Sequence, residues 1–279
     1  MEQNPAPVAR EILAHYADYD EQSRLSNTRS GALEFLRSQE LILRHMQTPP
    51  QKVLDVGGSP GVYSLWLASL GHEVHLIDPV QKHVLQAMDA SRNQPGNPVA
   101  SINIGDARSL TQGDASFYTV LLMGPLYHLS ERSDRIIVLQ KARRVLRPDG
   151  LIFVSVVCRF VTLMDGLTDG TIDDPYFVNI LRGTLNNGQH RNPRGVPDYF
   201  TTSFMHTPDE LEAEIADSGF DLIEMAAIQG PRWLANDFES RWANPERRTL
   251  LLELVRSVEH ECSMMCDSPH IMAIGEKRE

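Results

Sequence analysis

The stretch Lys52–Gly61, which reads KVLDVGGSPG, decides the fold. Its first half is a short apolar run typical of a buried strand, and its second half is a glycine-rich turn. Glycines allow the backbone N–H groups of such a turn to approach a ligand without a clash from Cβ. Asp55 stands at the strand end, where a carboxylate repels a pyrophosphate but attracts a cationic ligand. The stretch therefore predicts a strand–turn–helix unit that binds a small molecule.

Strand patterns and helix patterns alternate after this turn. Helices are predicted at 62–70, 81–92 and 130–146, the last with Ser130 as its N-cap, and strands at 52–56, 72–78, 99–104, 117–123, 151–155, 220–226 and 270–275. Thr207 and Glu210 form a capping box, and Asn244 caps a further helix. This alternation predicts an α/β fold, a Rossmann-like, doubly wound and mostly parallel sheet of seven strands.

Two segments depart from the alternation. Residues 1–50 are predicted to form an N-terminal helical cap, which ends at Pro49-Pro50, while residues 51–279 form the Rossmann-like domain. Within that domain, residues 159–206 are rich in glycine and proline and predict a lid insertion after the fifth strand. Two apolar helical stripes are predicted to face the core: Leu33, Leu36, Leu43 and Met46 in the cap, and Leu250, Leu254 and Val258 near the C-terminus.

Composition limits the partners of the protein. The 279 residues include 26 Lys and Arg and 37 Asp and Glu, a formal net charge of −11, so a nucleic-acid partner is not expected. The longest nearly apolar run, 117–129, is short for a membrane span, which needs about 20 residues. The first five residues lack the basic and apolar pattern of a signal peptide. These observations favour a cytoplasmic protein without a membrane span.

The cysteines do not indicate a disulfide framework or a metal site. Cys158, Cys262 and Cys266 are odd in number and widely separated. Cys262 and Cys266, with His260 and His270 nearby, match no usual order of structural zinc ligands. We therefore expect reduced thiols and no metal.

Two further acids follow strands of the predicted sheet. Asp78 closes the second strand 23 residues after Asp55, the position from which an acid accepts hydrogen bonds from both ribose hydroxyls. Gly105-Asp106-Ala107 ends the third strand and places another acid near an adenine amino group. An NAD-type Rossmann enzyme is the rival at the level of fold, but its turn has no acid at the position of Asp55 and does not predict the Asp106 element.

These elements resemble the class I S-adenosylmethionine-dependent methyltransferases, in the order and at the spacings of that family across residues 51–156. The matching motifs are Val53–Gly61, Leu76–Asp78, Gly105–Ala107, Leu122–Gly124 and Arg147–Gly150. The resemblance implies S-adenosylmethionine as the cofactor and assigns its contacts. Asp55 and Gly57 would face the methionine end of the cofactor, within the turn that also holds Gly58 and Gly61. Asp78 would bind the ribose, and Asp106 would bind the adenine N6. Ala107 would contact the adenine ring, and Met123 would line the methyl-transfer end. Ser59 replaces the middle glycine of many members, which predicts an altered turn with binding retained.

The sequence indicates fewer details of how the methyl acceptor is bound. The Gly-Pro-Leu-Tyr-His pattern at 124–128, with the helical cap and the insertion, resembles small-molecule methyltransferases of specialised metabolism. Candidate catalytic residues are His128, Tyr127 and Tyr199, and candidate substrate residues are Tyr16, Tyr19, Arg159 and His206. Arg159 could instead pair with Asp173 or Asp174. His45, His83 and His260 are interpreted as solvated helix faces.

Several alternatives remain open at this level. The acceptor is expected to be a small, largely apolar metabolite, methylated on carbon, oxygen or nitrogen. His128 could act as a general base for an oxygen nucleophile, with activity falling below a pKa of about 6.5, but simple alignment of the nucleophile is favoured. A protein that binds S-adenosylmethionine as a regulator without methyl transfer is the alternative function. The apolar N-terminal helix also predicts a homo-oligomer.

Overall fold

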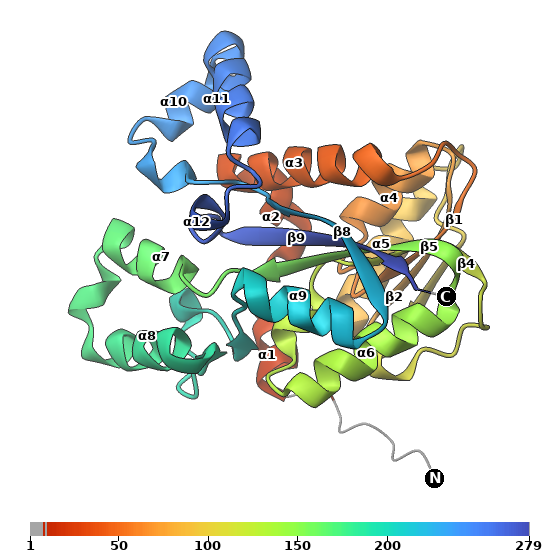
Figure 1. Ribbon diagram of the computed structural model, residues 1–279, viewed down its shortest axis with the longest axis horizontal. Helices are drawn as coiled ribbons and strands as arrows, with labels where there is room; N and C mark the ends of the chain where they lie inside the picture. Colours follow the sequence, from red (N-terminus) through yellow and green to blue (C-terminus); the bar gives the residue numbers. More distant parts are fainter. Residues whose placement is uncertain (1–7, 9, 279) are drawn as a thin grey trace.

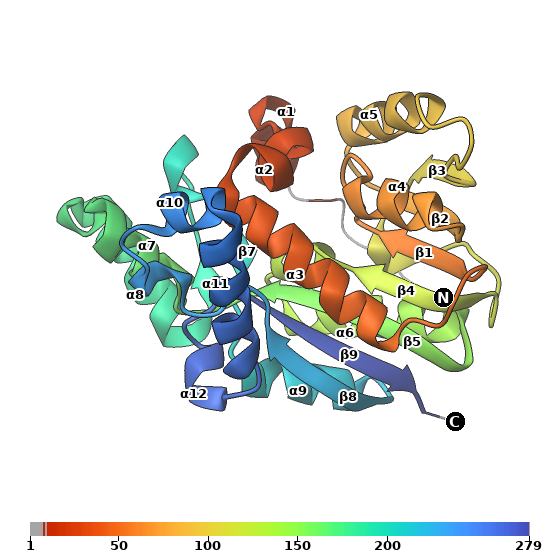
Figure 2. The same cartoon turned by 90° about the horizontal axis from the view of Figure 1, so that it is seen from above.

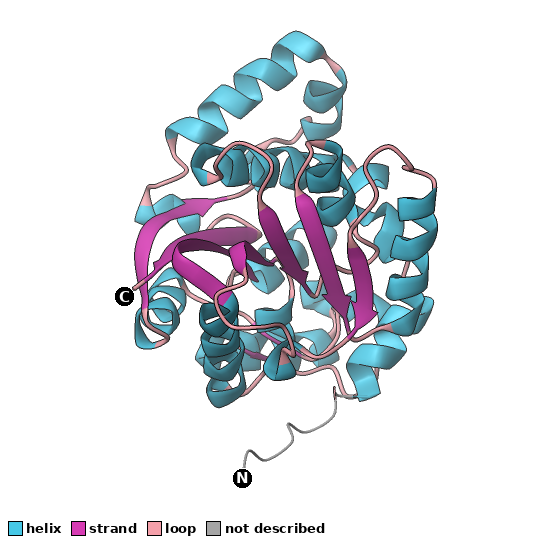
Figure 3. Ribbon diagram, turned by 90° about the vertical axis from the view of Figure 1, so that its right-hand side faces the viewer, coloured by secondary structure: helices cyan, strands magenta, loops and turns pink. Residues whose placement is uncertain are grey.

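The computed structural model describes residue 8 and residues 10–278 (Figure 1). The opening residues on which the signal-peptide expectation rests lie outside this part of the chain. Across the described residues, no helix has both the length and the apolar character needed to cross a membrane. The centre of the molecule is a sheet with helices on both of its faces (Figure 3).

The main sheet has seven strands in the order β3-β2-β1-β4-β5-β9-β8. The strands are β1 Lys52–Val56, β2 Glu73–Asp78, β3 Ser101–Ile104, β4 Phe117–Leu122, β5 Leu146–Val157, β8 Phe220–Ala227 and β9 His270–Lys277. Neighbours from β3 to β5 are parallel, and β9 pairs antiparallel with both β5 and β8. The predicted Rossmann-like, mostly parallel sheet of seven strands is therefore confirmed.

The two faces of the sheet are covered by different helices. On one face, α3 (Arg29–His45), α4 (Val62–Ser69) and α5 (Gln81–Arg92) bury apolar side chains against the sheet. On the other face, α6 (Arg132–Val145) and α9 (Pro208–Asp217) do the same. Figure 2 shows α3 lying along its face of the sheet, with α1 (Arg10–Asp18) and α2 (Glu21–Asn27) beyond its N-terminal end. This arrangement leaves the ends of the parallel strands accessible to α1.

Local signals placed most helix starts correctly. Thr207 and Glu210 form the reciprocal capping box of α9, and the Asn244 side chain caps α11 (Pro245–Ser257). The prediction for Ser130 was wrong, because α6 begins at Arg132 with Glu131 as its N-cap. The carbonyl of Ser130 instead accepts hydrogen bonds from Arg135 and from Gln189 of the insertion.

Both predicted apolar stripes were partly wrong. Leu33 and Met46 are buried in α3 and at its end, but Leu43 is 50% exposed, and Leu41 and Ile42 are buried in its place. In α11, the exposed Leu250 and Leu254 point away from the core, while Leu252 and Val255 are buried. Periodicity identified the helices, but several apolar positions competed for the buried face.

The insertion at 159–206 contains its own small structure. It holds α7 (Val161–Asp169), the 3₁₀ turn η3 (Thr171–Asp173), α8 (Pro175–Asn187) and η4 (Pro197–Tyr199), with a two-stranded sheet of β6 (Gln189–His190) and β7 (Ser203–Phe204). In Figure 1, α7 and α8 project from one end of the main sheet, and α10 (Phe238–Ala243) with α11 projects from another side. The insertion therefore begins directly after the C-terminal end of β5.

The burial pattern of α3 gives a stability prediction. Leu41→Ala should lower the free energy of unfolding by about 2–5 kcal/mol, because it leaves a cavity between α3 and the sheet. Leu43→Ala, two residues away on the exposed face, should change it by no more than about 0.5 kcal/mol. Urea unfolding followed by circular dichroism measures both. Equal losses for the two variants would contradict the burial of Leu41 against the sheet.

Candidate functional site

The turn after β1 is held in a left-handed conformation. Gly57 has a φ of +69° and its N–H donates to Ile77 O at 2.7 Å. Ser59 also lies in the left-handed region, with a φ of 52°, and its N–H donates to Asp78 Oδ2 at 2.9 Å. A Cβ added at Gly57 would stand 2.5 Å from Cγ of Pro125. The backbone of the turn therefore packs closely against the segment that follows β4 and leaves no room for a side chain at Gly57.

Asp55 lies beneath this turn. Its side chain is fully buried, and Oδ2 accepts a hydrogen bond from Ser64 Oγ at 2.7 Å. A Cβ at Gly58 would stand 2.7 Å from the same Oδ2. Burial raises the pKa of Asp55 to about 7, and no described residue donates a hydrogen bond to Oδ1. Asp55 thus supports the turn from below, and a cation placed above the turn would favour its ionised form.

A first cavity opens between the turn, the ends of β2 and β4, and α1. We use this name for the cavity lined by Val8, Ile12, Tyr16, Gly57, Ser59, 78–80, His83, 106–108, Gly124, Pro125, 127–131 and Asp134. It brings together four of the predicted cofactor residues, Gly57, Asp78, Asp106 and Ala107. The carboxyl ends of neighbouring parallel strands meet here, as expected for an open α/β sheet.

Asp78 is the best-defined acid of the first cavity. Its side chain is 4% exposed, and Oδ1 accepts the Val80 N–H at 2.8 Å. Oδ2 accepts the Ser59 N–H, and a carboxylate oxygen has room for a second donor. A ribose hydroxyl could therefore bind Asp78 without displacing the bonds that shape the turn. This donor and acceptor set fits the sugar of S-adenosylmethionine.

The carboxylate of Asp106 is bound by a neighbouring arginine. Its two carboxylate oxygens accept hydrogen bonds from Arg108 Nε at 3.0 Å and Nη2 at 2.7 Å, and Arg108 also donates to Asp134 at 3.0 Å. Ala107 follows within a 3₁₀ turn, η1 (Ala107–Ser109), for which Asp106 is the N-cap. An adenine amino group would have to share the Asp106 carboxylate with Arg108.

His83 is a site residue that the sequence interpretation missed. It was expected on a solvated helix face, but it is 1% exposed and lines the first cavity. Its Nδ1 lies 3.2 Å from Asp78 Oδ1, and its ring contacts Tyr16 edge-on at 5.1 Å between centroids. The available signal was the spacing of His83, Val84 and Ala87 at helical offsets just after Asp78, because that face of α5 must turn back toward the sheet.

The helix α1 covers the first cavity. Ile12 and Tyr16 are buried and pack with Val80. Lys82 of α5 donates to the carbonyl oxygens of Ala17 at 2.9 Å and Tyr19 at 3.0 Å, so a cation stands at the C-terminal end of α1. On its other side, α1 meets the insertion, where His15 contacts Phe200 edge-on.

His128 and the buried Tyr16 form a partly buried pair between α1 and η2 (Pro125–His128). Tyr16 Oη lies 2.8 Å from His128 Nε2. Burial lowers the pKa of His128 to about 3, with a smaller contribution from His15, and burial raises the pKa of Tyr16 well above its ordinary value. His128 is therefore neutral near pH 7. This low pKa disfavours the alternative in which His128 is a general base with a pKa of about 6.5, which the sequence left open because it does not show how α1 packs against the imidazole.

A second cavity lies between α1, α2 and the insertion. It is lined by 15–16, Tyr19, Glu21, Arg24, Tyr127, Val157, 161–162, Asp165, Asp169, Thr171, Phe177, His190, 197–200, Met205 and His270. Tyr16 and Tyr127 line both cavities. Desolvation raises the pKa of the Asp165 carboxyl to about 6, and the positive charge of Arg232 acts in the opposite direction. Tyr19 and Tyr199 both belong to this cavity, and the Tyr199 hydroxyl donates to Asp174 at 2.7 Å.

Several predicted site residues are not among those that line either cavity. Gly58 and Gly61 shape the turn, and Met123 packs against the core on the α3 face of the sheet. Arg159 pairs with Glu210 at 2.5 Å, not with Asp173 or Asp174, and its Nε donates to Met205 O. His206 is fully buried, with Nε2 3.3 Å from a carboxylate oxygen of Glu214. The side chains of Arg159 and His206 therefore brace the insertion against α9.

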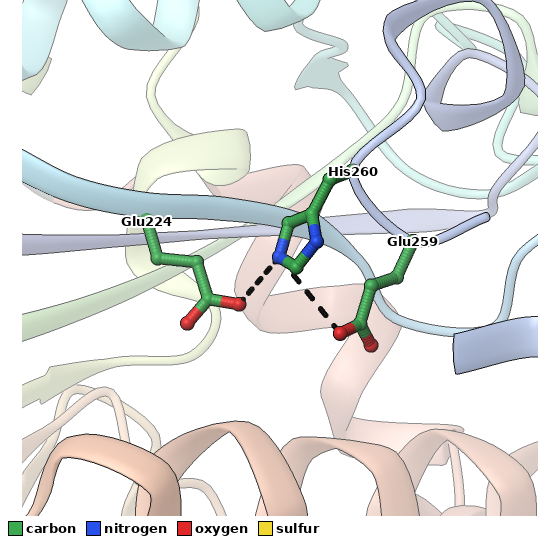
Figure 4. Close-up of side chains that lie close together, drawn as sticks. All are labelled: Glu224, Glu259 and His260. Atoms are coloured by element: carbon green, nitrogen blue, oxygen red, sulfur yellow. Dashed lines mark hydrogen bonds and ion pairs between the residues drawn. The ribbon is translucent and has the colours of Figure 1, made fainter. Parts of the chain in front are cut away.

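One cluster has the residue types of a metal site. Figure 4 shows His260 between the carboxylates of Glu224 and Glu259. Arg44 contacts both carboxylates, and Arg37, which is fully buried, also binds Glu259. Two guanidiniums at these acids supply the positive charge that a metal would supply, so we interpret the cluster as an ion-pair network that joins α3 to β8.

Comparisons with known proteins agree with this geometry. Residues 53–150 match a family described as a methyltransferase domain. A ubiquinone biosynthesis O-methyltransferase of Azorhizobium caulinodans is 25% identical over 177 residues, 63% of this chain and 61% of the relative. The chain spans 61–63% of the length of the curated relatives that it matches.

Solved structures share the fold. A protein of Pyrococcus horikoshii matches with a TM-score of 0.61 and 15% identity over 95% of this chain and 99% of that one. The 1,6-didemethyltoxoflavin-N1-methyltransferase of Burkholderia thailandensis, solved with its substrate and S-adenosylhomocysteine, matches with a TM-score of 0.55 and 14% identity over 99% and 93%.

The fold, the glycine turn with its acids and the domain match define the class of protein. Residues 53–150 match a methyltransferase domain, for which S-adenosylmethionine is the cofactor, and the chain has the fold of solved S-adenosylmethionine-dependent methyltransferases. Within the class, the curated relatives are named as O-methyltransferases of ubiquinone biosynthesis.

The environment of His128 gives a prediction that can be measured without a substrate. The His128 imidazole should stay neutral down to about pH 4, because burial holds its pKa near 3. Since the unfolded pKa of histidine is about 6.5, the stabilising contribution of neutral His128 is complete above that pH and is lost as the pH falls toward 3.

The measurement is an NMR titration of the imidazole signals, with His128→Asn used to assign the His128 resonance. A His128 resonance that titrates near pH 6.5 would contradict the low pKa that we assign to His128 beside Tyr16.

Proposed function

We propose that this protein is a methyltransferase that transfers the methyl group of S-adenosylmethionine to a small, largely apolar metabolite. The observation that supports this most directly is the pair of adjoining cavities, one beside the glycine turn and one walled by aromatic side chains, with Tyr16 and Tyr127 in common. A group-transfer enzyme needs two ligands side by side, whereas a protein that only senses the cofactor needs one.

The residues of the two cavities would act by positioning. When bound, S-adenosylmethionine supplies a methyl group that is already activated on a sulfonium. Asp78 would hold the ribose, the backbone of the turn at Gly57 would approach the methionine part, and Asp106 with Ala107 would bind the adenine. The rings of Tyr16 and Tyr127 would exclude water and align the acceptor with the methyl group.

The electrostatics favour alignment over base catalysis. With a pKa of about 3, His128 is a weak acceptor for a proton. Tyr127 is also neutral near pH 7, since burial raises its pKa well above the ordinary value. A carbon or neutral nitrogen nucleophile therefore suits the site better than an alcohol that must lose a proton first, although the curated relatives are named as O-methyltransferases.

We assign the reaction to natural-product biosynthesis, on the resemblance of the 124–128 pattern and the insertion to enzymes of that kind. The free thiols of Cys158, Cys262 and Cys266 support a reducing, cytoplasmic setting. The net charge of −11 opposes a nucleic-acid substrate. The competing function is a regulator that binds the cofactor and transfers nothing.

The cofactor site is tested by Asp78→Asn. S-adenosylhomocysteine should bind the unaltered protein at micromolar concentration, and Asp78→Asn should weaken that binding about tenfold to a hundredfold. The loss corresponds to one charge-assisted hydrogen bond, worth about 1.5–3 kcal/mol. Calorimetry measures both, with Asp89→Asn as the matched control, because Asp89 is exposed on α5, the helix that follows Asp78.

Transfer of a tritiated methyl group from the cofactor into small-molecule extracts of the host then separates the two functions. Binding without any labelled product would favour the regulator. If the folded protein does not bind S-adenosylhomocysteine, both the methyltransferase and the regulator function are rejected.

Assembly into a homo-oligomer is also proposed. Leu250 and Leu254 lie one turn apart on α11 and are 48% and 56% exposed, an apolar strip that a second copy could cover. Light scattering should give a mass above the 31.4 kDa of one chain, and Leu250→Glu with Leu254→Glu should return it to the monomer. A monomeric wild-type protein would reject the proposal.

A further inference from the structure

The second cavity is lined by flat aromatic side chains from three parts of the chain. Tyr19 follows α1, Tyr127 belongs to η2, and Phe177, Tyr199 and Phe200 come from the insertion. The rings of Phe177 and Tyr199 meet at 5.0 Å between centroids, and those of Tyr127 and Phe200 at 6.4 Å. Aromatic faces receive planar ligands, and their negative faces attract cations.

The charges around this cavity are mostly negative. The acids among its lining residues are Glu21, Asp165, Asp169 and Asp198, and the one guanidinium is that of Arg24. Arg24 is already bound to two carboxylates, with Nε 2.9 Å from Glu21 and Nη1 2.8 Å from the buried Glu34 behind it. The positive charge of Arg24 is therefore compensated within the protein, and the cavity as a whole repels an anion.

Asp165 differs from the other acids of the cavity. Asp169 accepts the N–H and the hydroxyl of Thr171, so its carboxylate caps η3. Asp165, on α7, accepts no hydrogen bond and makes no close ion pair among the described residues, and Arg232 of η5 (Arg232–Leu234) is the cation whose charge acts on it. Asp165 is exposed at the edge of the aromatic cavity, so its carboxylate is accessible to a ligand that brings its own positive charge.

We propose that the methyl acceptor is a planar, largely apolar ring compound that carries a positively charged nitrogen, and that Asp165 binds this nitrogen. The inference rests on the proposed function, and it specifies the substrate class of the second cavity. A cationic nitrogen would be attracted by the Asp165 carboxylate, whereas a neutral acceptor would gain nothing from it and a carboxylate acceptor would meet like charges. The rings of Tyr19, Phe177 and Tyr199 would stack on the acceptor while Asp165 fixes its charged end.

Three probes of similar size and shape test the charge preference of the second cavity. N-methylquinolinium is a permanent cation, quinoline is neutral at pH 8, and 2-naphthoate is an anion. Calorimetry at pH 8, with and without S-adenosylhomocysteine, should show N-methylquinolinium binding about tenfold more tightly than quinoline, and 2-naphthoate binding least. Asp165→Asn should weaken binding of the cation about tenfold and leave quinoline unchanged. Asp149→Asn is the control, because Asp149 has a left-handed φ of 59°, which asparagine tolerates, and lines neither cavity.

Equal affinity for the cation and quinoline would overturn the inference, as would a cation preference that survives Asp165→Asn. Either result leaves the proposed methyl transfer standing, provided that S-adenosylhomocysteine binds and label transfer is observed. A different result is also informative: the protein could fail to bind S-adenosylhomocysteine but still prefer the cation in a way that depends on Asp165. That result would reject the proposed methyltransferase function, but the second cavity would still bind planar cations.

Discussion

The carboxylate of Asp78 connects segments that are distant along the chain. Through the Ser59 N–H it fixes the left-handed turn after β1, through the Val80 N–H it sets the start of α5, and its Oδ1 faces the buried His83. The ring of His83 in turn contacts Tyr16 of α1. The positions of the turn, of α5 and of the N-terminal helix therefore all depend on one buried acid that also lines the first cavity.

Charge and solvation are arranged differently in the two cavities. Around the first, burial favours neutral forms: the pKa of Asp55 rises to about 7 and that of His128 falls to about 3. Around the second, carboxylates remain close to aromatic rings. A sulfonium cofactor carries a positive charge that disappears on methyl transfer, and the carboxylates of Asp78 and Asp106 in the first cavity would attract that charge while the cofactor is bound.

The fold could be read from the sequence because its signals are local. The strand at 52–56, the glycine turn and the helix at 81–92 are each encoded within a few residues, and the structure has them at those positions. The pair of Tyr16 and His128 is separated by 112 residues, so no local pattern could predict it or the low pKa of His128. Arg159 was misread for the same reason, since its partner Glu210 lies 51 residues away, whereas the burial of His83 was signalled locally by the spacing of α5. The family resemblance assigned Gly57, Asp78, Asp106 and Ala107 to the cofactor, and the first cavity collects them because strand ends in a parallel sheet converge.

The position of α1 has a kinetic consequence. This helix contacts α5 through Lys82, and it contacts the insertion through His15 and Phe200, while Tyr16 lines both cavities. Any outward movement of α1 therefore changes both cavities in the same step. Under the proposed function, release of the spent cofactor and release of the methylated product would be linked events, and the rate at which α1 moves would set an upper limit on turnover even where the chemical step is fast.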